Sequence, residues 1–589
     1  MQSIFARWIR FLAATALTGA CAAAAQMPSV PGEPALAPKT VAAPKLRLAA
    51  RDAPRLLLSP VTDSELASVR QANQRSMKRL VIGVTRRIDA SALLPAARDH
   101  LSWSAVQGGF AAQVAVSSPH AGAMRLALEL AGVSDDVEMV FFGSGAPDRL
   151  LGPVRVGAVA DRAAAWWSPL TDGDTQTVEI FVPGSLDPRA LPLRFSGASH
   201  VFTTIASAFA KRVADIGDAG SCNVDVKCSS LQSSASFLAI RNSVAEMVFT
   251  DGSFTVMCTG QLLNDADAST QTPWFYSANH CFENESLPYK TAAQMQAVAS
   301  TLNTLWFFEA VACSSQAVPP YSQMLGGATL IYNNPGADVL FLRLNDAPPL
   351  GAFFAGWDAN AVPPGSSIVV IHHPQGDLKK VSQGSVLRYS TPQPSLLGGP
   401  TTPFSEVAYT SGTTEGGSSG AGLFTFDGLQ YALRGALYGG GAFCSSPTES
   451  DWYSQFDKVY VALAPYLGAA SSGGVDYTDL WWNPAEAGWG LNIIQHASRN
   501  IFAVWYTYGN DARPMWFTLP GGTWTSSNTF SGAVYSTTAP AANTAFHPAR
   551  VRVTPVGTAA LTFSDANNAT WAWSINGVSG TKAITRQPY

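Results

Sequence analysis

The stretch GGSSGAG at residues 416–422 decides how the rest of this chain is interpreted. Small residues on both sides of Ser419 let the backbone bend sharply and bring amide N–H groups close to a substrate carbonyl. A hydroxyl beside such amides is what an oxyanion site requires. Flexible linkers use the same residue types, so the stretch indicates nucleophilic chemistry only together with a base and an orienting acid.

Two other segments supply those partners. His280 lies in WFYSANHC at 274–281, where an aromatic strand runs into a small-residue turn. Asp338 precedes the apolar run VLFL at 339–342, and a carboxylate beside an apolar strand is costly unless it is paired. Each residue alone has an ordinary structural interpretation. Together they form the set of base, acid and nucleophile that a catalytic triad needs.

These motifs resemble those of the chymotrypsin-like serine proteases, and most closely those of the bacterial lysyl endopeptidases. SANHC at 277–281 is similar to the histidine motif and GSSG at 417–420 to the serine motif. Further matches to the lysyl endopeptidase pattern are GSCNVDV at 220–226, AGWD at 355–358, IHHP at 371–374 and TEGGSSG at 414–420. The resemblance implies an all-β fold, with the triad in the crevice of a double antiparallel β-barrel.

By this resemblance, Ser419 attacks the scissile carbonyl, His280 transfers the proton, and Asp338 orients the imidazole. The N–H groups of Gly417 and Ser419 form the oxyanion hole. We therefore expect a serine endopeptidase that acts on protein or peptide substrates through an acyl-enzyme. The alternative is a catalytically inactive protease-like protein that binds through an aromatic C-terminal module. An esterase with the same triad is disfavoured, because the surroundings lack the strand-turn-helix context of α/β-hydrolases.

Departures from the family pattern concern the substrate pocket, which we expect Thr413, Tyr438, Gly439 and Ser454 to line. Ser454 stands where lysyl endopeptidases carry their pocket aspartate, and Thr413 where trypsin carries its own. Neither hydroxyl neutralises a buried cation, so lysine specificity is not expected. One alternative is that Asp451 or Glu449 reaches into the pocket from the same loop; the favoured interpretation is that both are solvated loop acids. Tyr438 replaces a histidine near the triad, where its ring would shield His280 from water.

The chain has seven cysteines, and one of them, Cys21, lies in the predicted leader at residues 1–25. Outside the leader there are six, an even number that predicts disulfides in an exported chain, although 15 pairings are open. The resemblance implies the pairs Cys222–Cys444, Cys228–Cys313 and Cys258–Cys281. Cys21 lies inside the leader, and lipidation there is disfavoured because Thr18 stands where lipoprotein signals carry leucine.

The first 25 residues read as a secretory signal peptide, with Arg7 and Arg10 before an apolar run at 11–20 and a small-residue cleavage site. That run is too short to span a membrane, and no later run is long enough. The expected protein is secreted, extracellular or periplasmic. A hydrophobic content of 47% and a charged content of 13% indicate globular domains, and the absence of a long basic run argues against nucleic-acid binding.

No cofactor or metal is expected. His372 and His373 are adjacent in a predicted strand and would point to opposite faces, and no HExxH motif is present. They also match a family motif without a metal role.

Five regions are expected: the signal peptide 1–25, an N-terminal pro-region or accessory domain 26–215, the peptidase domain 216–467, a linker 468–474 and a C-terminal module 475–589. Strands are expected at 80–84, 137–142 and 178–182, and helices around 205–213 and over 291–305. The resemblance makes 26–215 a pro-region that assists folding or covers the cleft, hence a zymogen; a permanent N-terminal domain is the alternative. Ser418 replaces the aspartate that trypsin-type zymogens pair with a freed N-terminus.

The C-terminal module holds eight of the sixteen tryptophans. Most of these rings are expected to form the core of a small β domain, since each buries a large apolar area. The other interpretation is an exposed aromatic surface that binds a polysaccharide, a peptide or a cell surface. The chain is expected to be a monomer.

Overall fold

The structure is a computed structural model, and it describes residues 27–36, 43–49, 53–74, 78–88, 101–159, 165–203, 219–267, 270–283, 289–315, 321–392, 401–468, 476–495, 500–526, 528–541, 543 and 550–588. The predicted signal peptide with Cys21, the helix expected around 205–213 and residues 469–474 of the predicted linker lie outside the described residues.

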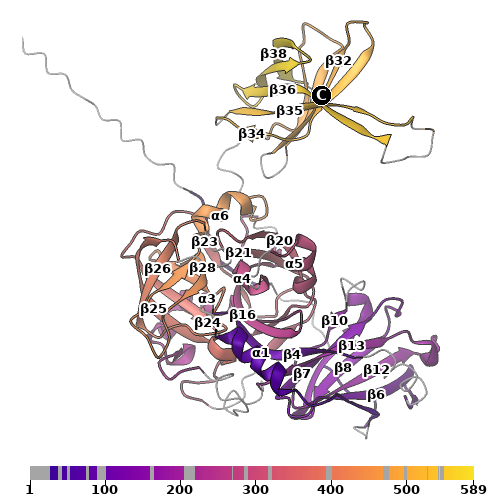
Figure 1. The fold of residues 1–589 in the computed structure, drawn as a ribbon, viewed down its shortest axis with the longest axis vertical. Helices are drawn as coiled ribbons and strands as arrows, with labels where there is room; N and C mark the ends of the chain where they lie inside the picture. Colours follow the sequence, from indigo (N-terminus) through magenta and orange to yellow (C-terminus); the bar gives the residue numbers. More distant parts are fainter. Residues whose placement is uncertain are drawn as a thin grey trace, which may run out of the picture.

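The central part of the chain forms the predicted double antiparallel β-barrel (Figure 1). The first barrel contains β15 (Val244–Asp251), β16 (Phe254–Leu263), β17 (Trp274–Ser277), β18 (Asn303–Trp306), β19 (Ser322–Met324), β20 (Ala328–Asn334) and β21 (Val339–Leu344). The second contains β24 (Ser367–His372), β25 (Lys380–Ser390), β26 (Phe404–Ser411), β27 (Gly422–Phe426), β28 (Tyr431–Gly440) and β29 (Asp451–Tyr453). Pairing of β29 with both β26 and β28 closes the second barrel.

Alternate side chains of strand β24 are buried in two different hydrophobic cores. Ile368 and Val370 are buried in the second barrel's own core, with Val407 and Leu437. Val369 and Ile371 point the other way, into a core shared with Trp357. Because successive residues of a strand face opposite sides, an apolar strand without alternation is buried on both faces. Strand β24, which pairs with the strand that follows Ser419, therefore cannot shift register cheaply.

Helices are few in the peptidase domain: α3 (Ala235–Arg241), α4 (Asn279–Phe282), α5 (Ala292–Ala299) and α6 (Phe456–Leu463). The helix predicted over 291–305 begins correctly, because Thr291 caps α5 and forms a capping box with Gln294. It ends earlier than predicted. Asn303 to Leu305 belong to β18, where pairing with β15 and burial of Leu305 override the local helical pattern.

The N-terminal region is a two-sheet β domain with its own core. One sheet contains β4 (Leu80–Arg87), β7 (Ala123–Glu129), β10 (Trp166–Trp167), β11 (Thr171–Asp172) and β13 (Arg194–Val201). The other contains β3 (Arg55–Leu57), β5 (Ser104–Val106), β6 (Gly109–Ser117), β8 (Glu138–Gly143), β9 (Ala146–Arg155) and β12 (Thr175–Pro183). The strands predicted at 80–84, 137–142 and 178–182 are β4, β8 and β12.

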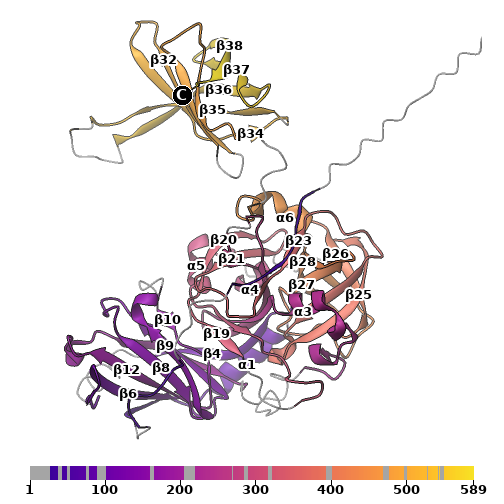
Figure 2. The ribbon, with the colours of Figure 1, turned by 180° about the vertical axis from the view of Figure 1, so that it is seen from behind.

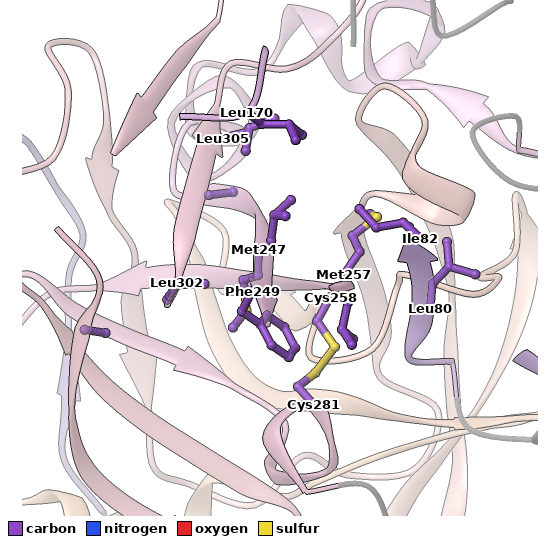
Figure 3. Close-up of a cluster of buried hydrophobic side chains, with 14 of the residues drawn as sticks. Leu80, Ile82, Leu170, Met247, Phe249, Met257, Cys258, Cys281, Leu302 and Leu305 are labelled. Carbon is purple, nitrogen blue, oxygen red and sulfur yellow. A yellow bond between two sulfur atoms is a disulfide. The ribbon is translucent and has the colours of Figure 1, made fainter. Parts of the chain in front are cut away.

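Strand β4 joins this domain to the peptidase. It pairs with β13 on one side and with β16 of the first barrel on the other, so one sheet runs through both domains. Both views of the ribbon show β4 and helix α1 (Asp63–Asn73) against the barrel (Figures 1 and 2). Side chains follow the same path: Leu80 and Ile82 are buried in one cluster with Met257 and the Cys258–Cys281 disulfide (Figure 3). The two domains thus share a hydrophobic core.

Two short segments near the described start of the chain also add strands to the peptidase. β1 (Ser29–Val30) pairs with β23 (Gly356–Asp358), and β2 (Glu33–Pro34) pairs with β22 (Phe353–Phe354). Strand β23 in turn lies parallel to β28. Strand β14 (Val224–Asp225) pairs with β25.

The C-terminal module is a separate sheet that closes on itself. Its strands are β30 (Asp479–Trp482), β31 (Gly490–Gln495), β32 (Ile501–Tyr508), β33 (Pro514–Leu519), β34 (Thr523–Trp524), β35 (Thr529–Thr538), β36 (Arg552–Phe563), β37 (Asn568–Ile575) and β38 (Val578–Arg586). A pairing between β33 and β35 closes the barrel. Trp481, Trp505 and Trp571 are buried in its core.

Candidate active site

His280 lies at the end of β17, in the one-turn helix α4. The aromatic strand TrpPheTyrSer at 274–277 is fully buried, and it pairs with β16 and β21. A disulfide between Cys281 and Cys258 ties the turn to β16. The strand pairing and the disulfide therefore restrict the position of the His280 imidazole independently of its own hydrogen bonds.

Asp338 directly precedes β21 and adopts a left-handed backbone conformation, with a φ of 51°. One carboxylate oxygen accepts from the backbone N–H of His280 at 2.9 Å, and the other lies 2.8 Å from its Nδ1. A carboxylate beside Nδ1 holds the proton on that nitrogen and leaves Nε2 free to accept. Asp338 is buried together with His280, so this pairing answers the sequence-based expectation that the carboxylate meets a partner.

Ser419 completes the group, because its Oγ lies 2.7 Å from Nε2 of His280. The turn around it depends on two glycines in left-handed conformations: Gly417 at a φ of 91° and Gly420 at 82°. A Cβ on Gly420 would lie 2.1 Å from the Oγ of Ser277, so only glycine fits there. The structure brings the three predicted residues into one chain of hydrogen bonds.

A residue of the N-terminal domain fills the space beside this serine. The carbonyl oxygen of Lys78 accepts from the backbone N–H of Gly417 at 2.6 Å and from that of Ser419 at 3.3 Å. These are the two amides that the sequence analysis expects to hold an oxyanion. A peptide carbonyl therefore already occupies that position.

The side chain of Lys78 extends into a closed polar pocket at the end of β29. Its ammonium donates to both carboxylate oxygens of Asp451 at 2.7 Å, to the hydroxyl and carbonyl of Thr414, and to the carbonyl of Ala442 at 2.5 Å. The ring of Phe443 lies 4.6 Å away. Burial lowers the pKa of the Lys78 ammonium from its ordinary value, and the charge of Asp451 opposes that shift.

Asp451 is held rigidly in the pocket. It accepts hydrogen bonds from the hydroxyls of Thr414 at 2.5 Å and Tyr409 at 2.9 Å, and the Tyr409 and Tyr453 hydroxyls lie 2.6 Å apart. The interpretation of Asp451 as a solvated loop acid is wrong, since it is fully buried. It lies where strands β26, β28 and β29 meet, so its carboxylate points inward rather than to solvent.

Three of the four residues expected to line the substrate pocket, Thr413, Ser454 and Gly439, make contacts within the second barrel instead. Thr413 is buried and its carbonyl accepts from the hydroxyl of Ser382. Ser454 forms hydrogen bonds with the backbone of Ala436 on β28. Gly439 pairs with Trp452 and continues the wall of the second barrel. None of these three supplies a hydrogen bond to Lys78 among the described contacts.

Tyr438 lies beside the base, as its position in the family pattern suggested. Its ring packs edge-on against the imidazole of His280, with 5.7 Å between centroids, and also against Phe404. The two neighbouring histidines are structural: His372 contacts the hydroxyls of Ser418 and Ser382, and burial lowers its pKa to about 3. Within the described ranges, no group of three or more His, Cys, Asp or Glu side chains could hold a metal ion.

The three disulfides join Cys222 to Cys444, Cys228 to Cys313 and Cys258 to Cys281, the pairs that the resemblance implied. The Cys222–Cys444 bond connects the first residues of the domain to the loop before Asp451.

Comparison with known proteins agrees with this geometry. The family model described as the lysyl endopeptidase C-terminal domain matches residues 216–454, and that described as the lysyl endopeptidase N-terminal domain matches residues 57–202. A lysyl endopeptidase from Pseudomonas aeruginosa is 34% identical over 373 residues, which are 61% of this chain and 76% of that protein. The chain belongs to the lysyl endopeptidase family. It is a serine endopeptidase.

Solved structures similar to this lysyl endopeptidase family member are more distant. The Rv3671c protease of M. tuberculosis in its active form is 17% identical, with a TM-score of 0.27, and the match covers 43% of this chain and 91% of that one. The protease Anisep from Arthrobacter nicotinovorans is 16% identical, with a TM-score of 0.26, over 39% of this chain and 96% of that one.

Sequence reasoning missed Lys78 and gave Asp451 only as the less favoured alternative. Lys78 lies more than 300 residues before Asp451, and no local pattern in a single sequence connects them. For Asp451 there was a usable signal: it precedes the aromatic pair Trp452 and Tyr453 at the start of a strand, as Asp338 precedes β21. An acid beside an apolar strand needs a partner, which for Asp451 is a cation.

Proposed function

We propose that the chain is a secreted zymogen of a lysine-directed serine endopeptidase. Ser419 attacks the scissile carbonyl carbon while His280 takes its proton and then gives it to the leaving amine. Asp338 keeps the imidazole in the tautomer that accepts at Nε2 and stabilises its protonated form. The N–H groups of Gly417 and Ser419 hold the oxyanion, a contribution of about 3–4 kcal/mol for one donor.

The single observation that carries this proposal is the double engagement of Lys78. Its carbonyl oxygen accepts from Gly417 and Ser419, and its ammonium is paired with the buried Asp451. A residue that satisfies both sites at once occupies the position of the residue preceding a scissile bond. The pocket therefore fits a lysine side chain, and an uncharged side chain there would leave the buried Asp451 carboxylate without a cation to balance its charge.

The test is substrate profiling of the mature peptidase with Asp451→Asn and a control, Asp427→Asn, in the exposed β27–β28 turn. Removing one partner of a buried ion pair costs about 3–5 kcal/mol. We expect Asp451→Asn to lower kcat/KM for lysyl substrates about 10²- to 10³-fold, with little effect on cleavage after uncharged residues. Equal rates after lysine and leucine in the unmodified enzyme would contradict the assignment.

Secretion and activation form part of the proposal. Three disulfides support an oxidising compartment, and the charge pattern of residues 1–25 supports export by a signal peptide. In the described part of the chain, no helix is both long and apolar enough to span a bilayer. N-terminal sequencing of the secreted protein checks both cleavage points, which we place after residue 25 and near residue 215.

A second function is proposed for the C-terminal module, which we expect to bind a polysaccharide or another cell-surface glycan. A pocket of about 430 Å³ is lined by Trp489, Trp505, Tyr508, Phe517 and Trp573, with Glu486, Asn510, Asn576 and Lys582 among its polar residues. Ring faces suit the apolar side of a sugar, and amide or charged groups suit its hydroxyls. Binding of the mature chain to a glycan array, compared with a chain ending at residue 467, tests this function.

A further inference from the structure

The peptide bond between Lys78 and Arg79 lies across the active site, and the chain is held tightly on both sides of it. A carbonyl oxygen bound by the N–H of Ser419 and of Gly417 presents its carbon to the hydroxyl of the same serine. Ser419 is fully buried beneath this segment. The bond is therefore presented as a substrate bond would be.

The leaving-group side is fixed by a strand. Leu80, Val81, Gly83 and Val84 of β4 pair with Met257, Val256, Thr255 and Phe254 of β16. The Arg79 guanidinium donates to the carbonyl of Cys281 at 3.0 Å and to Asp251 at 2.5 Å. Because β4 also pairs with β13, the amine that cleavage would free belongs to the central sheet of the N-terminal domain.

The acyl side is fixed by a different element. Asn73, the last residue of α1, donates from its amide to the carbonyl of Val81 at 2.9 Å and accepts from the N–H of Val81 at 2.8 Å. These two hydrogen bonds bridge the segment before the bond to the segment after it. Residues before Lys78 are also anchored by β1, β2 and β3.

We propose that Lys78–Arg79 is a reversible self-cleavage site, and that the N-terminal domain acts as a tethered inhibitor that is cut and resealed without leaving. This inference rests on the proposed function and goes beyond it. Ser419 Oγ bonds to the Lys78 carbonyl carbon as its proton passes to His280. The C–N bond to Arg79 then breaks, and His280 protonates the freed nitrogen.

From the Lys78–Ser419 ester, two reactions compete. Water can hydrolyse the ester to a Lys78 carboxylate, and in the reverse step Ser419 attacks that carboxyl group, water leaves and the ester re-forms. Alternatively, the Arg79 amine attacks the ester, re-forms the peptide bond and returns the proton through His280 to Ser419. Because β4 holds that amine next to the ester, its effective concentration is far above that of a free peptide. Hydrolysis of an ordinary substrate proceeds because its product leaves, and here the product is held by Asn73, β4 and the shared core.

The experiment follows this bond in the full-length chain after removal of the signal peptide. Intact mass in denaturant measures the fraction cut between Lys78 and Arg79, and native size-exclusion chromatography shows whether the pieces stay together. We expect a constant partial cut, the same ratio whether the starting sample is intact or cut, and incorporation of ¹⁸O from labelled water into the Lys78 carbonyl of uncut chains. Ser419→Ala should show no cut.

Asn73→Ala tests the two hydrogen bonds between Asn73 and Val81. The matched control is Gln71→Ala, at an exposed position of the same helix. Loss of two hydrogen bonds should raise the ratio of cut to uncut chain about tenfold and speed release of the acyl side. Gln71→Ala should leave the ratio unchanged.

Three results overturn the proposal: complete cutting with release of the segment that ends at Lys78 in the unmodified chain, no cut and no ¹⁸O, or an unchanged ratio in a folded Asn73→Ala chain. If that variant fails to fold, the ratio of cut to uncut chain in the unmodified protein and the ¹⁸O content of its uncut chains still test the proposal. Activity of the separately prepared mature peptidase on a lysyl peptide distinguishes the two proposals. An active peptidase with no cut and no ¹⁸O in the full-length chain overturns the self-cleavage and leaves the protease assignment, whereas an inactive peptidase overturns both.

Discussion

The N-terminal domain and the C-terminal module are both cysteine-free β structures, yet they relate to the peptidase in opposite ways. The first shares a sheet with it through β4 and a core through Leu80 and Ile82, and it places Lys78 in the active site. The second closes its own barrel, and its described strands pair only with one another. A shared sheet couples the stability of a domain to the state of the site, whereas the closed barrel has no strand pairing with the peptidase among the described residues.

The largest effect should come from Ser419→Ala in the mature peptidase, because its hydroxyl is the proposed nucleophile. We expect kcat/KM for a lysyl peptide to fall about 10⁴- to 10⁶-fold. The N-terminal domain should still dock in the full-length variant, since β4 and the Lys78–Asp451 pair do not need the hydroxyl. Steady-state kinetics and limited proteolysis measure the two parts. A fall below tenfold would contradict the triad assignment.

The next effect tests whether Lys78 is what closes the site. In the full-length chain, Lys78→Ala should raise turnover of a small lysyl ester about 10²-fold, because the ion pair with Asp451 is lost from the inhibitory contact. Lys45→Ala, at an exposed lysine of the same region, is the control and should change nothing. Equal activity of the two variants would show that other contacts cover the cleft.

The meeting of Ser419, His280 and Asp338 could be predicted from sequence because each of the three belongs to a local pattern. Ser419 lies in a turn of small residues, His280 ends an aromatic strand, and Asp338 precedes an apolar one. The double barrel followed from the family motifs, and strands β4, β8 and β12 from local runs of β-branched and aromatic residues.

The end of helix α5 and the acid of the substrate pocket could not be predicted, because both depend on pairing between strands that are distant in sequence. Thr291 signalled the start of α5, but its end is set by β18 pairing with β15. By position the acid of the pocket was expected at Ser454 or Thr413, with Asp451 a less favoured alternative, whereas the pairing of β29 with β26 and β28 brings Asp451 beside Lys78. Burial of a charge is a property of the assembled barrel, and no window of sequence around Asp451 contains Lys78.

A smaller effect should separate the C-terminal module from the peptidase. Tyr508 lines the module's pocket, while Trp516 is exposed but does not belong to that lining. Tyr508→Ala should weaken glycan binding about fivefold to tenfold through loss of one ring contact, and Trp516→Ala should not. Neither variant should change kcat/KM on a short lysyl peptide more than twofold. A parallel loss of peptidase activity would contradict the independence of the two parts.

The smallest effect is a loss of folding stability at acidic pH, caused by His200 in the sheet that the N-terminal domain shares with the peptidase. His200 lies on β13, which pairs with β4, and burial, together with the charge of Arg86, lowers its pKa to about 4. An unfolded histidine has a pKa of about 6.5, so between these values the unfolded chain binds more protons. Stability therefore falls as pH drops from about 6.5 to about 4, by about 3 kcal/mol at most, and levels off below. Urea unfolding of the Ser419→Ala full-length chain at several pH values measures this, and His200→Gln should flatten the slope while His120→Asn, at an exposed position, should not. If the slope is unchanged in His200→Gln, the acid sensitivity of the N-terminal domain arises elsewhere, and β13 does not link proton binding to the inhibitory strand.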